Sequence, residues 1–391
     1  MKILYIAGLY RKRSCSASIR NVALTNGLSS HGCDVSVLTV KFPPEVLDPF
    51  LMSSVNEDIN VIEVDSGFIS SYIPTTYRNE GNSVHKTNIL KKVIKEFLYF
   101  PGVDKKWISA INSEYFTGYD LIISSSDTKT SHFVARKIIK NTPTRWLQIW
   151  GDPWADDIGL KNFFVKLRAH LAEEKLLNGA DYIGYVSLPT TNRMKDKFPY
   201  LLDKINYIPR NFFSVVEKNI TQKHIFKISY TGVLNGRDVE PILEAIECFN
   251  SNSSVIVSLD VFGRATVEQK HLIEACPFSE YHGEVSLQDV LNVFKSSDAL
   301  LYLGNAAGTS QIPGKLYDYF GTNLPILALV QDLHDDVSTF ILDSQRCIVF
   351  QNIKSKINFS ELISNRDSFS VLEQYSPNSV ASSILKILES K

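Results

Sequence analysis

The sequence lacks the features that mark membrane-spanning, disulfide-stabilised and nucleic-acid-binding proteins. No apolar run reaches roughly 18 residues, so we expect no membrane-spanning helix. Only five cysteines are present and none stands in a Cys-x-x-Cys spacing, which favours a reducing compartment and argues against a structural metal site. Neither sign of charge dominates: 41 Lys and Arg face 42 Asp and Glu, so the chain is not built around a nucleic-acid backbone.

The even balance of charge conceals two halves of opposite sign. Residues 1–210 carry 27 Lys and Arg against 21 Asp and Glu, a net charge of +6, and residues 211–391 carry 14 against 21, a net charge of −7. A chain of 391 residues has room for two ordinary domains. We expect a first domain over 1–215, a second over 216–375 and a closing helix over 376–391. The basic half suits an anionic partner, although chance divergence of the two surfaces explains the asymmetry equally well.

Short segments rich in Ile, Val, Leu and Tyr alternate with helical segments along both halves of the chain. The first of them, "KILYIAGLY", is followed at once by "RKR" and by no small-residue cleavage site, so we interpret it as a buried strand rather than a signal peptide. Strands that alternate with helices predict the α/β class, with parallel sheets covered on both faces. Because such sheets bind ligands at the carboxyl ends of their strands, functional residues are expected just after strands.

Two strand-end loops of the second half carry glycine followed by arginine. "KISYTGVLNGRD" places Gly232 after a strand and Arg237 before a helix, and "VFGRAT" places Gly263 and Arg264 after the next strand. Glycine lets the backbone approach an anion closely, and a guanidinium can grip a phosphate with two hydrogen bonds. A tight turn with a solvated arginine is the alternative for each loop.

A third loop joins small residues to a charged helix. In "GNAAGTSQIPGKLYDYFG" the residues Gly308, Thr309 and Ser310 offer N–H groups and hydroxyls to a diphosphate. Lys315 and Asp318 follow three residues apart, so they share one face of the helix. The lysine would neutralise phosphate charge and the carboxylate would accept hydrogen bonds from a ribose diol, although an ordinary surface ion pair is the alternative.

These motifs, taken in order, resemble the retaining glycosyltransferases of family 4. "TGVLNGRD", "LDVFG", "YHGEVSLQDVLNVF" and "GTSQIPGKLYDYFGTNLPILAL" are similar to the donor half of that family, and "SASIRNVALTNGLSSHGCDVSVLT" and "KINYIPRNFF" to its first half. The resemblance covers most of the chain, and its most specific part runs from 304 to 325. It implies the GT-B fold, with two Rossmann-like doubly wound domains that face each other across a cleft, and a C-terminal helix that crosses back to the first domain.

The resemblance also implies roles for residues of the second half. The family has two carboxylates eight residues apart; the second falls on Asp318, whereas the first falls on Ser310 or its neighbour Gln311, neither of which is charged. Its phosphate-binding cations fall on Arg237 and Lys315. A family glycine is replaced by Asn323, which tolerates positive φ, so the turn is expected to persist. The donor-binding residues are then expected to be Gly232, Arg237, Gly263, Arg264, Val285, Gly308, Thr309, Ser310, Lys315 and Asp318.

The first half supplies candidates for binding the acceptor. "TRWLQIWGDPWADD" ends a strand with aromatic rings beside carboxylates, a combination that suits a sugar ring and its hydroxyls. Asp152 is the candidate that orients or deprotonates the acceptor hydroxyl, and so joins Arg237 and Lys315 as a catalytic candidate. Core tryptophans and a turn are the alternative, and a lone histidine is more often structural. The acceptor-binding residues are expected to be Gly8, Arg20, His132, Trp150, Asp152 and Trp154.

One further segment, 88–107, combines lysines with aromatic and aliphatic residues. It could rest on an anionic bilayer, with each cation contributing about 1 kcal/mol, or form a solvated surface helix. With no signal peptide or membrane span, we expect a cytoplasmic protein, associated at most with the inner face of the cell membrane.

The sequence as a whole favours a retaining, metal-independent glycosyltransferase. It would transfer a sugar from a UDP- or GDP-sugar, which is a substrate rather than a cofactor, to a sugar or polyprenyl-linked acceptor in surface polysaccharide or glycoconjugate synthesis. No Asp-x-Asp pair follows a strand, and Asp156 and Asp157 are adjacent rather than spaced, so no metal is expected. The alternatives are a nucleotide-sugar epimerase or hydrolase of the same fold, and an inactive sugar-nucleotide-binding partner subunit.

Overall fold

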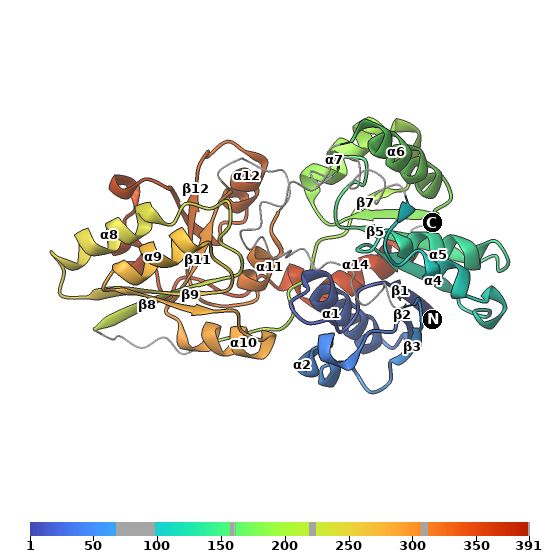
Figure 1. Ribbon diagram of the computed structural model, residues 1–391, viewed down its shortest axis with the longest axis horizontal. Helices are drawn as coiled ribbons and strands as arrows, with labels where there is room; N and C mark the ends of the chain where they lie inside the picture. Colours follow the sequence, from blue (N-terminus) through green and yellow to red (C-terminus); the bar gives the residue numbers. More distant parts are fainter. Residues whose placement is uncertain (68–97, 157–159, 161, 219–223, 306–311, 390–391) are drawn as a thin grey trace. The chain divides into compact units, whose positions relative to one another are not determined.

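A computed structural model describes the chain apart from residues 68–97, 157–159, 161, 219–223, 306–311 and 390–391 (Figure 1). The chain forms two compact units. Unit 1 comprises Met1–Asn211 together with Pro377–Lys391, and unit 2 comprises Phe212–Ser376. Unit 1 therefore contains both ends of the described chain, and unit 2 is inserted into it. The sequence interpretation placed the divisions at 215 and 375.

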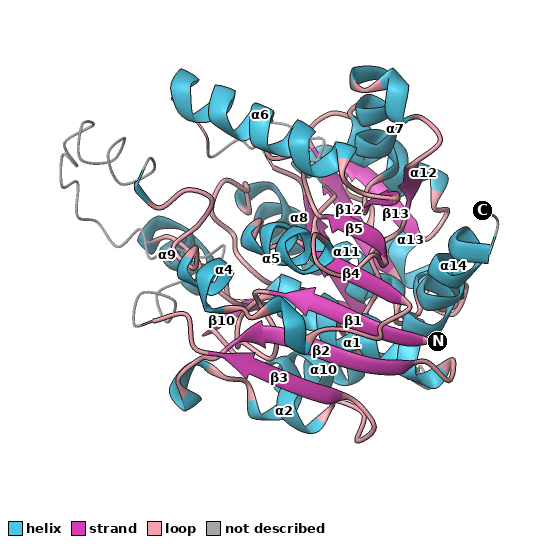
Figure 2. Cartoon of the chain, turned by 90° about the vertical axis from the view of Figure 1, so that its right-hand side faces the viewer, coloured by secondary structure: helices cyan, strands magenta, loops and turns pink. Residues whose placement is uncertain are grey.

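Unit 1 is built on a parallel sheet with the strand order β3-β2-β1-β4-β5-β6-β7. The strands are β1 (Lys2–Ala7), β2 (Asp34–Val40), β3 (Asn60–Val64), β4 (Leu121–Ser125), β5 (Arg145–Trp150), β6 (Tyr182–Tyr185) and β7 (Ile205–Tyr207). The inner strands are almost continuously buried, because helices cover both faces of the sheet, and this is why they are apolar at successive positions. Figure 2 shows β3, β2, β1, β4 and β5 side by side in this order.

The helices of unit 1 include the last helix of the chain. They are α1 (Ser16–Ser30), α2 (Pro49–Ser53), α4 (Lys106–Ala110), α5 (Thr130–Ile139), α6 (Phe163–Asn178), α7 (Leu188–Lys197) and α14 (Pro377–Glu389). Helix α14 packs against α1, and the two backbones approach closely at Gly27, where a Cβ atom would lie 2.3 Å from the carbonyl oxygen of Pro377. Glycine is required at this crossing for that reason.

Unit 2 repeats the architecture on a smaller parallel sheet with the strand order β10-β9-β8-β11-β12-β13. The strands are β8 (Ile225–Thr231), β9 (Ile256–Phe262), β10 (Ser279–Gly283), β11 (Ala299–Leu303), β12 (Ile326–Val330) and β13 (Cys347–Gln351). The helices are α8 (Glu240–Asn250), α9 (Val267–Ala275), α10 (Leu287–Ser296), α11 (Gly314–Phe320), α12 (Asp336–Asp343) and α13 (Phe359–Ser364). The prediction of two doubly wound α/β sheets is confirmed.

Each sheet has one point at which the strand order reverses. In unit 1 it lies between β1 and β4, and in unit 2 between β8 and β11. Helices leave the sheet toward opposite faces at such a point, so the carboxyl ends of the two strands border a crevice suited to a ligand. Gly8 follows β1, whereas Gly232 follows β8 and Gly304 follows β11. The candidate sites are therefore sought at these two places.

Asn323 does not adopt the positive φ that the sequence analysis considered for it. Asn323 is absent from the non-glycine residues with positive φ, which among the described residues are Arg11, Ser14 and Gln345. The Asn323 amide instead bonds the backbone of Lys218, accepting from its N–H at 3.0 Å and donating to its carbonyl at 2.9 Å. The side chain thus connects the turn to residue 218 and does not replace the conformational freedom of a glycine.

Candidate functional site

Two glycines form the backbone surface of the candidate site in unit 2. Gly232 has φ 118° and Gly263 has φ 126°, values that residues with a Cβ atom rarely adopt. A Cβ atom on Gly263 would lie 1.9 Å from the carbonyl oxygen of Gly232, so no larger residue fits there. The loops after β8 and β9 therefore touch through their backbones and leave a surface without side chains beside the point where the strand order reverses.

Arg237 is fixed between the loop after β8 and the end of β11. Its Nε donates to the carbonyl of Leu303 at 3.0 Å, and its Nη1 donates to the carbonyls of Val233 at 2.7 Å and Asn235 at 3.4 Å. Among the described residues, the remaining nitrogen, Nη2, has no hydrogen bond. The guanidinium is thus held in place by Nε and Nη1 and keeps donors for a ligand.

Lys315 is the least satisfied charged group of this site. It stands in the first turn of α11, and its Nζ is buried with no hydrogen-bond partner in the described part of the chain. Nζ lies 3.8 Å from the ring centroid of Tyr230 and 3.3 Å from the place a Cβ atom of Gly232 would take. Burial, and next the charge of Arg237, hold the pKa of Lys315 well below its usual range. An anion would supply the missing acceptor.

Asp318 stands one turn after Lys315 on the same helix, and the surface ion pair considered as an alternative is not formed, because Lys315 Nζ has no acceptor among the described residues. The next residue, Tyr319, is buried, and its hydroxyl accepts from the N–H of Thr231 at 3.2 Å and donates to the carbonyl of Leu301 at 3.2 Å. Burial raises the pKa of Tyr319 to about 12. Tyr319 therefore fixes α11 against the ends of β8 and β11, and with it the position of Asp318.

The other predicted donor residues lie elsewhere or outside the described chain. Gly308, Thr309 and Ser310 are among the residues that the structure does not describe. Arg264 donates from Nε to Glu284 at 2.5 Å, one residue before Val285, so its guanidinium is engaged in an ion pair. The structure thus brings together Gly232, Gly263, Arg237 and Lys315. Tyr230 and Tyr319 were not predicted, because a tyrosine in an apolar segment gives no signal beyond core packing.

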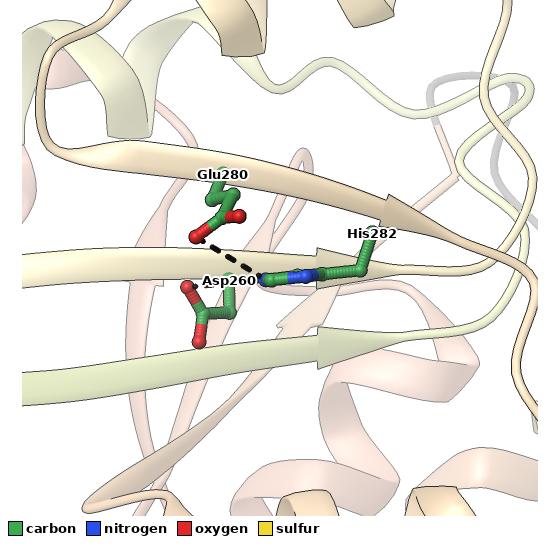
Figure 3. Close-up of side chains that lie close together, drawn as sticks. All are labelled: Asp260, Glu280 and His282. Atoms are coloured by element: carbon green, nitrogen blue, oxygen red, sulfur yellow. Dashed lines mark ion pairs between the residues drawn. The ribbon is translucent and has the colours of Figure 1, made fainter.

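One group of side chains in unit 2 has the composition of a metal site. Asp260 on β9 and Glu280 and His282 on β10 point toward one another, as Figure 3 shows, and their ligand atoms lie within 4.8 Å of one another. His282 Nε2 is 3.5 Å from Asp260 Oδ1 and 3.8 Å from Glu280 Oε2. Lys227 Nζ lies 2.6 Å from Asp260 Oδ2, so a lysine already neutralises the most buried carboxylate. The ion pair with Lys227 thus occupies one oxygen of Asp260 in this group.

In unit 1 the structure gathers three of the predicted acceptor residues at the carboxyl ends of β1, β4 and β5. Gly8 follows β1, and its N–H donates to Ser131 Oγ at 2.9 Å. The buried Arg20 reaches from α1 to the end of β4, where it donates to Ser125 Oγ at 3.3 Å and to the carbonyl of Ser126. Asp152 follows β5, and its carbonyl accepts from Lys129 Nζ at 3.2 Å.

The predicted aromatic face for the acceptor sugar does not match the structure. Trp150 and His132 are fully buried and stack on each other with ring centroids 4.1 Å apart, while Trp154 is 5% exposed and stacks on Phe100. Trp150 Nε1 donates to Gln148 within the core. Burial, together with two nearby cations, holds the pKa of His132 well below its usual range. These rings belong to the core of unit 1, which was the structural alternative.

A buried carboxylate that was not among the predicted site residues shapes the loop after β5. Glu173 of α6 is fully buried and accepts hydrogen bonds from the N–H groups of Trp154 at 2.6 Å and Ala155 at 3.4 Å. Burial raises the pKa of this carboxyl. Because the loop also carries Asp152, Glu173 determines where the predicted acceptor carboxylate lies.

The comparison with solved structures found proteins that are similar over nearly the whole chain, whereas the comparisons by sequence found none. No protein-family model matches the sequence, and no curated protein does either. Among solved structures, a protein from Listeria monocytogenes described as a UDP-N-acetylglucosamine 2-epimerase has a TM-score of 0.58 at 11% identity, with coverage of 100% of this chain and 96% of that one. Anabaena Alr3699/HepE, solved with UDP and glucose, has a TM-score of 0.54 at 11% identity, with full coverage of both chains.

A third similar structure is the glycotransferase of kitacinnamycin, with a TM-score of 0.51 at 12% identity and coverage of 99% of this chain and 94% of that one. At these identities the likeness shows the fold alone. The chain thus has the GT-B fold, with two doubly wound parallel α/β domains. No helix in the described part of the chain is both long enough and apolar enough to cross a membrane.

Proposed function

We propose that the protein is a retaining, metal-independent glycosyltransferase of family 4 that transfers a sugar from a UDP- or GDP-sugar. The observation that carries the proposal is the buried Lys315 ammonium, which has no hydrogen-bond partner among the described residues and lies beside Gly232 and Arg237 where the strand order of unit 2 reverses. A buried charge without a partner destabilises a fold, so its presence is best explained by a ligand. Anabaena Alr3699/HepE, of the same fold, was solved with UDP.

The donor diphosphate would bind over the two glycines. Their missing side chains let phosphate oxygens approach the backbone, and Lys315 and Arg237 supply N–H donors from two sides. Negative charge grows on the leaving diphosphate as the glycosidic bond breaks, and cations fixed before the reaction stabilise that charge without reorganising. Asp318 would accept hydrogen bonds from the ribose hydroxyls. Retention rests on the family resemblance.

The acceptor would bind to unit 1 at the carboxyl ends of β1, β4 and β5. Asp152 would orient or deprotonate the attacking hydroxyl, with Glu173 fixing its loop and Arg20 the end of β4. A sugar or polyprenyl-linked sugar is the proposed acceptor, in the synthesis of a surface polysaccharide or glycoconjugate. A cytoplasmic enzyme at the inner face of the membrane would meet both substrates.

A nucleotide-sugar epimerase is the second candidate, because the similar structure from Listeria monocytogenes is described as one. The same cations would then hold the diphosphate, and the configuration of the sugar would change at one carbon. The two candidates differ in whether an acceptor is needed for the reaction. A transferase releases the nucleoside diphosphate when an acceptor is added, whereas an epimerase converts the donor without an acceptor, and chromatography of the nucleotides separates these outcomes.

The substitution Lys315→Met tests the binding role directly. It keeps the length of the side chain and removes its charge, so the affinity for UDP or GDP should fall roughly 10- to 100-fold in calorimetry, the loss expected for hydrogen bonds to a charged group. Lys354→Met provides the control, since Lys354 lies in the same unit with half its side chain exposed. Equal affinities for the two variants would remove Lys315 from the nucleotide site.

A further inference from the structure

Helix α6 of unit 1 presents an apolar surface to solvent. Four large apolar side chains of its first half are exposed, at 70% for Phe163, 72% for Phe164, 46% for Leu167 and 59% for Leu171. With 100° of rotation per residue, they fall in one stripe about 100° wide. We call these four residues the α6 stripe. Figure 1 shows α6 beside α7 at the edge of unit 1.

The opposite face of the same helix already serves the core. Val165, Ala169, Leu176 and Leu177 are buried against the sheet of unit 1. A surface helix ordinarily turns a polar face outward, because only one face has a core to cover. Helix α6 is apolar on both faces, so packing within unit 1 explains its inner face and leaves the α6 stripe unexplained. Contiguous exposed apolar surface of this kind marks an interaction site.

Basic side chains border the α6 stripe. Lys166 and Lys175 are exposed on either side of it. The two carboxylates near its C-terminal end are engaged: Glu173 is buried and accepts from backbone N–H groups, and Glu174 accepts from the Tyr200 hydroxyl at 2.9 Å. Arg168 lies over the ring of Phe100 at 4.0 Å, which joins α6 to the described end of the segment 88–107. There Leu98 is 59% exposed and Lys105 is exposed. Basic side chains thus border the apolar stripe on both sides, with Glu174 at its C-terminal end.

We propose that the α6 stripe docks the protein onto an anionic lipid bilayer. Phe163, Phe164, Leu167 and Leu171 would enter the boundary between head groups and acyl chains, while the exposed Lys166 and Lys175 reach lipid phosphates, the arrangement by which amphipathic helices lie in an interface. A second copy of the chain is the less suitable occupant, because a two-fold contact would bring the same cations together. The proposal does not depend on the sugar-transfer activity.

The predicted membrane segment 88–107 is thereby revised in part. Residues 88–97 lie outside the described chain, and the described residues 98–107 lie beside α6 through the contact of Phe100 with Arg168. The stripe on α6, which the sequence analysis did not consider for this role, supplies the apolar contact. Its side chains recur at helical spacing, as core residues do, and only the structure shows which of them face solvent.

Co-sedimentation of the full chain with vesicles tests the proposal. The probes are vesicles of phosphatidylcholine alone and vesicles of phosphatidylcholine and phosphatidylglycerol in equal amounts. The wild type should bind the anionic vesicles, and the double variant Phe164→Gln with Leu167→Gln should bind on the order of 100-fold more weakly, since two apolar side chains no longer leave water. Lys166→Gln should weaken binding roughly five-fold, and only with anionic vesicles.

The control variant is Leu342→Gln on α12 of unit 2, where the leucine is 47% exposed, much as Leu167 is. It should bind vesicles as the wild type does, and circular dichroism should show all variants folded. Wild-type binding that survives the double substitution, or no binding at all, overturns the proposal. A wild-type dimer that the double variant dissociates in sedimentation velocity, without vesicle binding, also overturns it and assigns the stripe to a second copy.

Discussion

Each unit has a buried cation near the point where its strand order reverses, and the two cations differ in their hydrogen bonds. In unit 1, Arg20 is buried against the end of β4 and hydrogen-bonded to Ser125 and Ser126. In unit 2, Lys315 is buried against the ring of Tyr230 on β8, and its Nζ has no hydrogen-bond partner among the described residues. Arg20 is thus hydrogen-bonded through Nη2, although its buried Nε has no partner in the described part of the chain, whereas the single nitrogen of Lys315 makes no hydrogen bond there. An anion would supply the acceptor that Lys315 lacks. Hydrogen-bond satisfaction therefore distinguishes two sites that topology alone makes equivalent.

The largest expected effect concerns the second cation of unit 2. Arg237→Ala should lower sugar transfer on the order of 100-fold or more, because the guanidinium would stabilise the leaving diphosphate. Arg237→Lys should recover part of the rate, since it restores the charge without the fork. Turnover is measured with radiolabelled donor and an acceptor panel. Near wild-type transfer by Arg237→Ala would contradict the proposed role of the unit 2 cations.

The next effect compares the two cations by stability. Arg20→Met should lower the free energy of unfolding by about 2 to 3 kcal/mol, because it abandons hydrogen bonds to a charge. Lys315→Met should raise it by about 1 kcal/mol, because it removes a buried charge that has no hydrogen-bond acceptor among the described residues. Urea denaturation of each variant measures both values. A Lys315→Met protein that is clearly less stable than the wild type would contradict the comparison.

The difference in stability between Lys315→Met and the wild type should depend on pH in one direction. The folded state holds the pKa of Lys315 well below the unfolded value, so the unfolded chain binds the proton more strongly and the lysine's penalty shrinks as pH rises through the folded pKa toward the unfolded one. The stability advantage of Lys315→Met over the wild type should therefore diminish as pH rises from the folded pKa to the unfolded pKa. A difference that does not change with pH would mean that the lysine is not strained by burial.

A smaller effect is expected at Asp318. Asp318→Asn should weaken nucleotide binding about tenfold, because an amide accepts fewer hydrogen bonds from a ribose diol than a carboxylate does. Calorimetry with UDP and with the 2′-deoxy nucleotide separates this contact from a general loss of the site, since the variant should no longer distinguish the two. An unchanged dissociation constant would remove Asp318 from the ribose site.

The parallel sheets could be predicted because their inner strands are buried on both faces and are therefore mostly apolar, as β11 and β12 are. Lys315 and Arg237 were found by their place after strands. The burial of Trp150 and His132 could not be predicted, because a strand end gives the position of a ring without the direction in which it points.

The crossing of α14 over α1 at Gly27 affects the order in which the two units can finish folding during synthesis. The ribosome delivers α1 early, but its partner follows only after the whole inserted unit 2. Unit 2 is contiguous and can fold as it emerges, whereas the apolar side of α1 that α14 covers stays open until α14 is made. Unit 1 is thus begun before unit 2 and completed after it, and a chain truncated before Pro377 would present that open surface to chaperones and proteases.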